Sequence, residues 1–479
     1  MKKLLVILVM LIAFSVNAQW EPSFRLTNAS GSSSLSYNNT HNIAANGNIL
    51  HTVWQDNRDG NLEIYYKRST DGGTTWGTDT RLTNNTSVSG YPGIAVSGSL
   101  VHIIWEDLRN NNWQIYYKRS TDGGVTWGTD TRLTNITQNS NTPSIAVSGS
   151  IVHAVWHDNR DGNYEIYYKR STDGGGSWGS DIRLSNNIES STYASIAVFG
   201  SIVHIVWRDF RDSNFEIYYK RSQDAGLSFG AETRLTSNSG ASNSPTIAVS
   251  GSVVNTLWDD SRDGTIEIYS KRSIDGGITW GVDQRLTNNT NNAYSYSPSI
   301  AVSGSNVHLV WYGNRDSNTD EIYYNRSQDG GVTWGTDTRL TNNSSVSNFP
   351  SIEVSGSILH VVYCDNAIGW KIYYLRNLTG NVGIQNISTE TPSKYSLSQN
   401  YPNPFNSTSN LKFQIVNTED VKLIVYDIMG KEVQTLVNER LQPGTYEAAF
   451  DASSLNTGVY FYKLITNGFT ETKKMLLIK

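Results

Sequence analysis

The residues best suited to chemistry recur in short polar loops, each placed after an apolar segment that ends in an aromatic residue. One copy is Asp158-Asn159-Arg160-Asp161, with Glu165 four residues further on. Arginine beside carboxylates, with aromatic and amide side chains nearby, suits the binding of sugars or acidic ligands. The candidate ligand-binding residues are Asp56, Arg58, Asp107, Arg109, Asp158, Arg160, Asp209, Arg211, Asp260, Arg262 and Arg315.

The repetition of these loops also favours a second interpretation, in which aspartate and arginine pair within each hairpin and hold its shape. A catalytic centre needs an acid and a nucleophile with different pKa values, and near-identical repeats do not supply that difference. We therefore assign no catalytic residue from the sequence. A binding role and a structural role for the loops both stay open.

The elements that position the loops follow from an internal repeat. Equivalent apolar segments end in Trp54, Trp105, Trp156, Trp207, Trp258, Trp311 and Tyr363. The first four intervals are 51 residues each, followed by 53 and 52. A period of this length, with four short strands in each copy, is typical of a β-propeller.

Seven copies predict an all-β, seven-bladed β-propeller over residues 19–376. In the third copy, residues 144–149 form the inner strand, residues 151–156 the second and residues 165–170 the third, and Arg183-Leu184 opens the fourth. The last copy has no fourth strand of its own. We expect residues 24–28 to supply it and to close the ring, which removes exposed sheet edges.

A Gly-rich turn recurs between the third and fourth strands, with the pattern Ser-x-Asp-Gly-Gly-x-Thr-Trp at residues 69–76. Its carboxylate can accept backbone N–H bonds, and its glycines permit positive φ. The structural aspartates are Asp71, Asp122, Asp173, Asp224, Asp275 and Asp329. The turn resembles the Asp-box, or bacterial neuraminidase repeat, of the sialidase-like superfamily. In an up-and-down blade these turns lie on the face opposite the Asp/Arg loops.

Two further groups of side chains recur with the repeat. Histidines precede the aromatic residue by three positions, at His51, His102, His153, His204, His308 and His360. Each lies on a different blade and has no second ligand nearby in sequence, so we interpret them as core histidines and expect neither a metal nor a cofactor. The loops before the inner strands add Tyr91, Tyr193, Tyr296 and Phe349 to the face that carries the arginines.

The N-terminus and the composition indicate a secreted protein. Lys2 and Lys3, an apolar run and Val16-Asn17-Ala18 form a secretory signal peptide over residues 1–18. The apolar run is too short for a transmembrane helix, and we expect no transmembrane segment in the mature chain. The net charge of −5 argues against nucleic acid as a partner. The single cysteine, Cys364, allows no intrachain disulfide.

The last hundred residues form a separate module. Residues 377–394 are polar and are predicted to be a linker, and residues 395–479 alternate strands with Gly and Pro turns, as in a small immunoglobulin-like β-sandwich. The residues YPNPFN (401–406), Gly458-Val459-Tyr460 and the terminal KKMLLIK resemble the C-terminal sorting domain of the bacterial type IX secretion pathway. The resemblance implies partners in the secretion machinery, transient passage through the periplasm, and delivery to the outer cell surface or the medium.

Three functions stay open for the propeller. The first is a non-catalytic binding module for glycans or cell-surface polymers, and we favour it because near-identical blades suit multivalent weak binding. The second is an exo-sialidase or related glycoside hydrolase. Sialidases need three arginines from different blades, a tyrosine nucleophile with its glutamate, and an aspartate acid, and no such set stands out. The third is a structural or adhesive scaffold. The chain is thus predicted to bind rather than cut.

Overall fold

The computed structural model divides into two compact units, Trp20–Arg376 and a C-terminal unit that runs from Asn377 to Lys479. It describes residues 20–37, 40–316, 319–356, 358–378, 384–388, 391–406, 408–441, 443–452 and 455–479. These residues form strands and turns only, and none of them belongs to a helix long and apolar enough to span a membrane. The predicted signal peptide, residues 1–18, lies outside the described residues.

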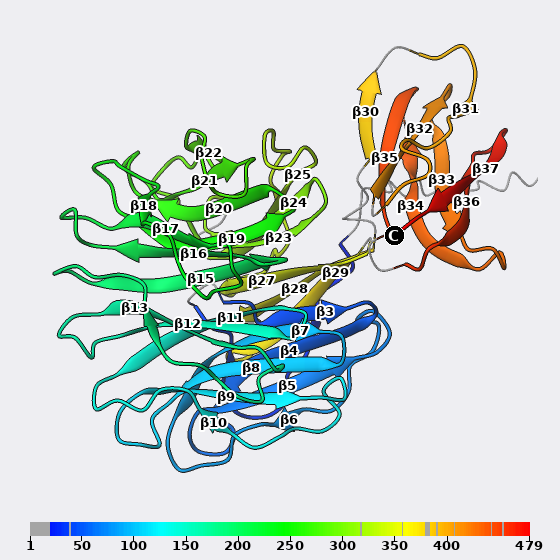
Figure 1. Cartoon of the computed structure of the whole chain (residues 1–479). Helices are drawn as coiled ribbons and strands as arrows, with labels where there is room; N and C mark the ends of the chain where they lie inside the picture. Colours follow the sequence, from blue (N-terminus) through cyan, green and yellow to red (C-terminus); the bar gives the residue numbers. More distant parts are fainter. Residues whose placement is uncertain are drawn as a thin grey trace, which may run out of the picture. The chain divides into compact units, whose positions relative to one another are not determined.

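The first unit is built from seven antiparallel sheets, counted over the described residues, and each sheet is one blade of a propeller (Figure 1). The innermost strands are β3 (Ile43–Asn46), β7 (Ser89–Ser97), β11 (Ser140–Ser148), β15 (Ser191–Phe199), β19 (Ser242–Ser250), β23 (Ser295–Ser303) and β27 (Ser347–Ser355). Each contacts the next along the chain, and β27 contacts β3, so the inner strands form a closed circuit.

The other strands follow outward in each blade. The second strands are β4 (Ile49–Asp56), β8 (Leu100–Asp107), β12 (Ile151–Asp158), β16 (Ile202–Asp209), β20 (Val253–Asp260), β24 (Asn306–Gly313) and β28 (Ile358–Asp365). The third strands are β5 (Glu63–Ser69), β9 (Gln114–Ser120), β13 (Glu165–Ser171), β17 (Glu216–Ser222), β21 (Glu267–Ser273), β25 (Glu321–Ser327) and β29 (Lys371–Asn377). The outer strands are β6 (Thr80–Arg81), β10 (Thr131–Arg132), β14 (Ile182–Arg183), β18 (Thr233–Arg234), β22 (Gln284–Arg285) and β26 (Thr338–Arg339).

The last blade takes its outer strand from the N-terminus, as the sequence predicts. Strand β1 (Phe24–Arg25) pairs antiparallel with β29, with Phe24 opposite Tyr374 and Arg25 opposite Tyr373. A short strand, β2 (Ser33–Ser34), pairs with β4 in the first blade. Because the two ends of the repeat array share one sheet, the circuit of blades is closed and the β29 edge is covered.

The hydrophobic core lies between blades rather than within one sheet. Ile104 and Tyr117 of one blade pack in a single cluster with Trp156 and Tyr167 of the next. Trp156 is fully buried, and β12 is buried along almost its whole length, because both faces of each sheet meet a neighbouring blade. Apolar residues on both faces of the second strands are therefore required by the stacking of blades.

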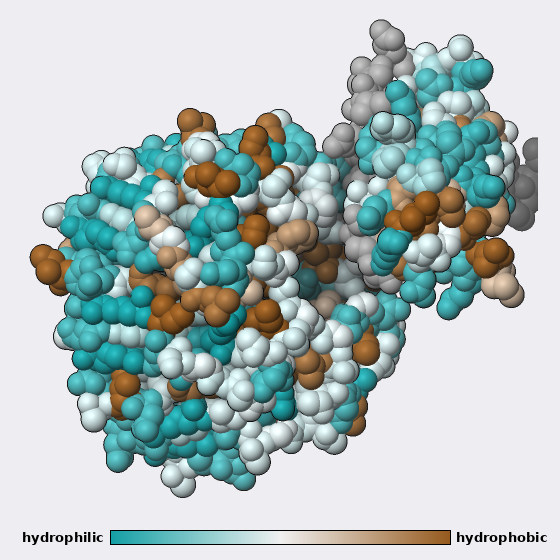
Figure 2. All heavy atoms as spheres, viewed as in Figure 1, coloured by the Kyte–Doolittle hydropathy of each residue, from teal (hydrophilic) through white to brown (hydrophobic). Residues whose placement is uncertain are grey.

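The inner strands enclose a central channel with a cavity of about 380 Å³. Successive Ile-Ala-Val segments line it, and small alanine side chains let the seven strands approach one another there. In the last blade Glu353 stands at the alanine position, and burial raises its pKa to about 7. On the face that Figure 2 shows, hydrophilic residues predominate and hydrophobic side chains are scattered.

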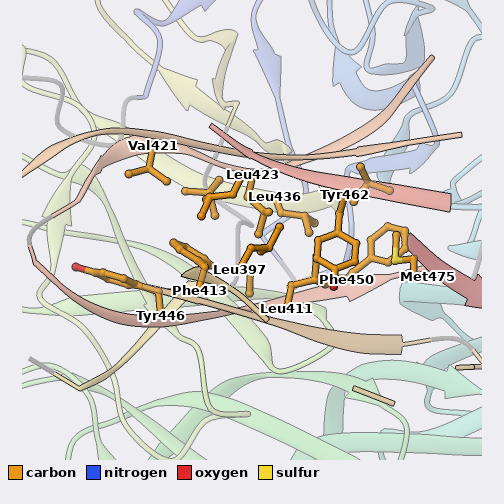
Figure 3. Packing of buried hydrophobic residues seen from close by; sticks show 14 of the residues in the cluster. Leu397, Leu411, Phe413, Val421, Leu423, Leu436, Tyr446, Phe450, Tyr462 and Met475 are labelled. Carbon is orange, nitrogen blue, oxygen red and sulfur yellow. The ribbon is translucent and has the colours of Figure 1, made fainter. Parts of the chain in front are cut away.

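The C-terminal unit is a sandwich of two four-stranded sheets. One has the order β30 (Ile384–Ser388), β35 (Gly444–Asp451), β32 (Thr408–Ile415), β31 (Ser396–Leu397). The other has the order β34 (Glu432–Leu441), β33 (Glu419–Tyr426), β36 (Gly458–Ile465), β37 (Thr470–Leu477). Phe413, Leu423 and Tyr462 belong to the core between them (Figure 3).

The sandwich begins earlier than the sequence predicts. Strand β30 lies inside residues 377–394, the stretch predicted to be a linker, and Ile384 pairs with Ala448 of β35. Strand β30 is at the end of its sheet, and its backbone pairs with one neighbour only. A polar sequence is common in such an edge strand, so the composition of this stretch did not predict a strand.

Candidate functional site

The predicted Asp/Arg loops form closed networks of ion pairs and hydrogen bonds. Asp158 is fully buried and accepts hydrogen bonds from Trp156 Nε1 at 3.0 Å and from Arg160 Nη2 at 2.5 Å. Arg160 Nη1 contacts Asp181 Oδ2 at 2.7 Å, and its guanidinium lies 4.1 Å above the Tyr167 ring centroid. The guanidinium of Arg160 is therefore occupied on both edges and on one face by its own blade.

The other blades repeat this arrangement with small changes. The corresponding pairs are Arg58 with Asp56 and Asp79, Arg109 with Asp107 and Asp130, Arg211 with Asp209 and Glu232, and Arg262 with Asp260 and Asp283. Arg315 pairs with Asp337 at 2.5 Å, because Gly313 takes the place of the strand-end aspartate. This geometry is what a role in holding the hairpins requires. The ligand-binding role of these residues stays a prediction.

The Asp-box turns lie at the opposite end of the third strands from these loops, because the strands are antiparallel. Asp173 accepts N–H bonds from Gly176 and Ser177, both at 2.9 Å, and a 2.7 Å bond from the Ser177 hydroxyl. These bonds lower the pKa of its carboxyl. Gly175 has φ +80°, and a Cβ there would lie 1.9 Å from the Tyr117 hydroxyl oxygen of the preceding blade. The box thus fastens each blade to its neighbour.

The repeated histidines are core residues, as the sequence predicts. Nδ1 of His153 lies 2.6 Å from the Tyr168 hydroxyl on the adjacent strand. Burial, with a smaller effect of Arg170, lowers the pKa of His153 to about 4. Five further histidines bond to tyrosines in the same way: His51, His102, His204, His308 and His360. Among the described residues, no three His, Cys, Asp or Glu side chains come together as a metal ion would need.

The structure places seven different side chains at one equivalent position, the residue that follows the buried aromatic of each second strand. These mouth residues are Gln55, Glu106, His157, Arg208, Asp259, Tyr312 and Cys364. Six of them lie opposite an inner-strand residue next to a register shift, as His157 lies opposite Asn141 and Arg208 opposite Thr192. Gln55 lies opposite Ser34 of β2. Here the blades, otherwise nearly alike, each carry a different chemical group.

In six of the blades the register shift brings a residue with positive φ beside the mouth residue. These residues are Tyr91, Thr142, Tyr193, Ser244, Ser297 and Phe349, with φ between 46° and 55°. None is glycine, so this backbone is strained in each of these six blades. Bulges of this kind turn a side chain toward a new direction and are frequent beside binding sites.

The mouth residues bond to the positive-φ residue of the next blade. The N–H groups of Tyr91, Thr142 and Ser297 donate to Gln55 Oε1 at 2.8 Å, Glu106 Oε2 at 2.7 Å and Asp259 Oδ2 at 3.3 Å. Nδ1 of His157 accepts from Tyr193 N at 3.5 Å and lies 2.7 Å from Thr142 Oγ1. Since a backbone N–H can only donate, His157 is assigned the tautomer with its proton on Nε2.

Arg208 interrupts this series because a guanidinium cannot accept a hydrogen bond. Its Nε donates to Thr192 Oγ1 at 3.0 Å and its Nη1 to Asn243 Oδ1 at 2.9 Å. Its guanidinium carbon lies 4.2 Å from the Tyr193 ring centroid and 4.3 Å from that of Phe215. Arg211 of the same hairpin pairs with two carboxylates, whereas Arg208 forms no ion pair within the described part of the chain.

Arg208 and two other mouth residues line a pocket at one side of the channel mouth, with a volume of about 620 Å³. We call it the mouth pocket. Its lining is Tyr37, Tyr91, Glu106, Trp113, Asn139, Asn141, Thr142, His157, Tyr164, Ser190, Thr192, Tyr193, Arg208 and Phe215. Aromatic rings, amides, hydroxyls, one guanidinium, one imidazole and the carboxyl of Glu106 thus meet in a space large enough for a ligand of several sugar units.

The titratable groups of the mouth have shifted pKa values. Burial raises the pKa of Glu106 to about 7, against the opposing hydrogen bonds from Thr142 and Asn141. Burial likewise raises the pKa of Asp259 to about 6, with Ser244, Ser297 and Arg208 opposing. Burial and the nearby Arg208 lower the pKa of His157 to about 3, so this imidazole is neutral at pH 7.

The sequence interpretation missed most of this pocket. It identified Tyr91 and Tyr193 on the correct face, and it singled out none of Glu106, His157 or Arg208. The signal was present as a contrast, because the residue after the shared aromatic differs in all seven repeats. The residue before the third strand gives the same signal, as Trp113, Tyr164 and Phe215 stand at one repeat position.

Comparison with known protein families accounts for both units. Residues 7–197 and 55–309 match the BNR repeat-like domain, and together these matches cover more than half of the chain. The chain belongs to the BNR repeat-like family. Residues 399–479 of this BNR protein match the secretion system C-terminal sorting domain. The protein is therefore exported by the type IX route to the cell surface or the medium.

Solved structures share the fold of the BNR propeller at low sequence identity. The PL25 ulvan lyase bound to -[GlcA(1-4)Rha3S]- is 12% identical with a TM-score of 0.54, over 72% of this chain and 94% of that one. A Trypanosoma rangeli sialidase mutant with trans-sialidase activity is 11% identical with a TM-score of 0.46, over 95% and 90%. No curated protein matches the sequence. At 12% identity the likeness to the ulvan lyase establishes the propeller fold alone.

Proposed function

We propose that the BNR propeller is a binding module for acidic saccharides, and that Arg208 in the mouth pocket pairs with the carboxylate or sulfate of the ligand. The observation that carries this proposal is the environment of Arg208. Two aromatic rings hold its guanidinium, two neutral acceptors fix its Nε and Nη1, and the described residues offer no acceptor to Nη2. A positioned, half-buried cation that forms no ion pair is a receptor for an anion.

The rest of the pocket supports a sugar rather than an inorganic anion. Tyr91, Tyr164, Tyr193 and Trp113 offer aromatic rings to the apolar faces of pyranose rings, and Asn139 and Asn141 offer amides to hydroxyl groups. Export to the cell surface or the medium places the pocket where polysaccharides are encountered. A relative by fold, the ulvan lyase, was solved with a glucuronate-containing saccharide, which is consistent with this class of ligand.

A second candidate function is elimination from a uronate, and the grouping of His157 with Arg208 favours it. An arginine that neutralises a uronate carboxylate acidifies the adjacent C–H, and a neutral imidazole can accept that proton. Against it, Nδ1 of His157 faces Tyr193 N–H and Thr142, so the assigned tautomer presents Nε2–H, a donor, to the remaining space. Elimination therefore requires either tautomer exchange or a tyrosinate as base, and we rank it below binding.

A sialidase or related glycoside hydrolase is supported less well by this site. Sialidases need three arginines from different blades, and Arg208 is the one arginine in the lining of the mouth pocket. A structural scaffold that binds no ligand does not explain the strained bulges or the lack of an ion pair at Arg208. Neither alternative rests on an observation comparable to the environment of Arg208.

The experiment is a calorimetric titration of the full chain with glucuronic acid, for the wild type, Arg208→Ala and Arg211→Ala. Loss of a hydrogen bond to a charged group costs about 1.5–3 kcal/mol, which is roughly a tenfold to hundredfold loss of affinity for Arg208→Ala. Arg211→Ala is the matched control in the same hairpin. It should lower the melting temperature and leave the affinity for glucuronic acid unchanged. Equal loss in both variants would favour the Asp/Arg loops as the binding residues instead. In a separate assay with a polysaccharide of 4-linked uronates, growth of ultraviolet absorbance from a new C4=C5 bond, formed as the C5 proton is removed and the C4–O glycosidic bond breaks, would establish elimination.

A further inference from the structure

Aromatic side chains continue from the mouth pocket around the channel mouth. The ring centroids of Tyr91 and Tyr37, both in the pocket, lie 4.5 Å apart. The Phe349 ring follows at 5.9 Å from Tyr37, and the Tyr312 ring at 5.5 Å from Phe349. Tyr296 then stacks on Tyr312 at 5.8 Å, and Tyr294 follows at 5.1 Å. We call Tyr294, Tyr296, Tyr312, Phe349 and Tyr37 the aromatic row. It extends the pocket across two further blades.

The backbone that presents the row is the same backbone that presents the pocket. Tyr296 lies opposite Tyr312 in the β23–β24 ladder, next to the register shift of that blade. Phe349 has φ +50°, the strained conformation that Tyr193 adopts in the pocket with φ +55°. The rings are partly exposed, and Tyr37 retains 40% of its surface. In the blades of Tyr91, Tyr193 and Phe349 the strained position thus carries an aromatic ring.

The charges along the row differ from those in the pocket. The Tyr294 hydroxyl donates to Asp320 Oδ1 at 2.6 Å, and burial, Asp259 and Asp320 together raise the pKa of Tyr296. Carboxylates near the row repel an anion, whereas Arg208 in the pocket attracts one. The pocket suits an acidic sugar, and the row suits sugars without charge.

We propose that the aromatic row is a second binding site, which holds the neutral sugars of a polysaccharide whose acidic sugar lies beside Arg208. The inference rests on the proposed function of the mouth pocket. Aromatic rings pack against the C–H faces of successive pyranose rings, and a chain that occupies pocket and row together gains affinity from both. The preferred ligand is then a polymer in which acidic and neutral sugars are mixed, rather than a single uronate or a fully charged chain.

The test titrates the full chain with three probes: glucuronic acid, neutral xylotetraose, and xylotetraose that carries one glucuronic acid. The wild type should bind the acidic tetrasaccharide about tenfold more tightly than glucuronic acid, since the two sites are linked. Tyr296→Ala should remove this gain and leave the affinity for glucuronic acid within about twofold of the wild type. Tyr296→Phe keeps the ring and should keep the gain. Tyr401→Ala, an exposed tyrosine of the C-terminal sandwich, is the matched control.

The outcomes separate the row from the pocket. If glucuronic acid binds and the attached neutral sugars add nothing, or if Tyr296→Ala weakens both acidic probes equally, the row is not a binding site. If glucuronic acid does not bind while xylotetraose binds and Tyr296→Ala abolishes that binding, the row stands and the proposed function of the pocket is wrong. If none of the three probes binds, both proposals fail. The melting temperature of each variant shows that the fold is retained.

Discussion

The guanidinium carbon of Arg208 lies 4.2 Å from the ring centroid of Tyr193, on the neighbouring inner strand, where Tyr193 has φ +55°. The strained backbone of Tyr193 thus places the ring that holds the one unpaired arginine of the mouth pocket. A cation over an aromatic face gains about 0.5–2 kcal/mol, depending on how well water is excluded. Arg208 is in this way held in position before any ligand arrives.

Replacing Tyr193 should therefore weaken acidic ligands without removing the charge that binds them. We expect Tyr193→Ala to lower the affinity for glucuronic acid by roughly threefold to thirtyfold, the range of a lost cation–π contact. Tyr193→Phe retains the ring and should bind nearly as the wild type does. Titration calorimetry measures both. An unchanged affinity in Tyr193→Ala would show that Arg208 does not depend on this ring.

Glu106 should make the protein less stable as the pH rises. Its pKa is raised from 4.5 to about 7 by burial, so the folded state holds the proton more tightly than the unfolded state does. The stability it contributes is full below pH 4.5 and is lost as the pH rises through 7. Glu106→Gln keeps an acceptor for the Thr142 N–H, and should raise the unfolding free energy at about pH 8 by about 2–3 kcal/mol.

Urea unfolding at about pH 5 and about pH 8 checks this expectation. Glu353 and Asp259 also have raised pKa values, so the variant should keep part of the pH dependence of the wild type. The difference between the variant and the wild type should shrink to less than about 1 kcal/mol at about pH 5, where Glu106 is protonated in the folded state. A difference of the same size at both pH values would mean that Glu106 is not the titrating group.

The Asp-box turn should govern stability and leave binding untouched. Asp173 accepts four hydrogen bonds within its turn, from Ser171, Gly176 and Ser177, and their loss in Asp173→Ala should lower the melting temperature by a few degrees. Because these bonds lower the pKa of Asp173, its contribution is present above about pH 4 and is lost as the pH falls below it. Thermal unfolding at neutral and acid pH measures both effects. A fall in glucuronic acid affinity at an unchanged melting temperature would contradict the structural role.

The end of the C-terminal sandwich should be needed for delivery to the cell surface. Strand β37 (Thr470–Leu477) pairs with β36 and contributes Met475 and Leu477 to the sandwich core. Removal of residues 473–479 should leave the propeller folded and retain the protein in the periplasm. Cell fractionation with antibody detection follows its location. Normal surface delivery of the truncated chain would refute the sorting role of these residues.

The repeat made most of the fold predictable. The spacing of Trp54 to Tyr363 predicts the blades, and the missing outer strand of the last copy predicts the pairing of Phe24 with Tyr374. These features depend on pattern alone, because every blade meets the same environment on both faces. Strand β30 was not predictable in this way, since its pairing with β35 depends on a partner sixty residues away and its own sequence is polar.

The mouth pocket was not predicted from the sequence, because its residues differ between the repeats. The residues that the repeats share, such as Asp158 and Arg160, were predicted to bind the ligand. In the structure Arg160 bonds to Asp158 and to Asp181. Arg208 lies between two shared residues, Trp207 and Asp209, and differs from its counterparts in the other six blades. Its surroundings come from Tyr193 and Asn243, and the bulges that bring them close are visible only in three dimensions.

The central claim is that the acidic group of the ligand lies against Arg208, and a crystal structure of the full chain with glucuronic acid tests it most directly. The account predicts the carboxylate within hydrogen-bond distance of Arg208 Nη2, with the sugar ring against the aromatic side chains of the mouth pocket. Electron density for the sugar over the Asp/Arg loops, beside Arg160 or its counterparts, with the mouth pocket filled by water alone, would contradict it.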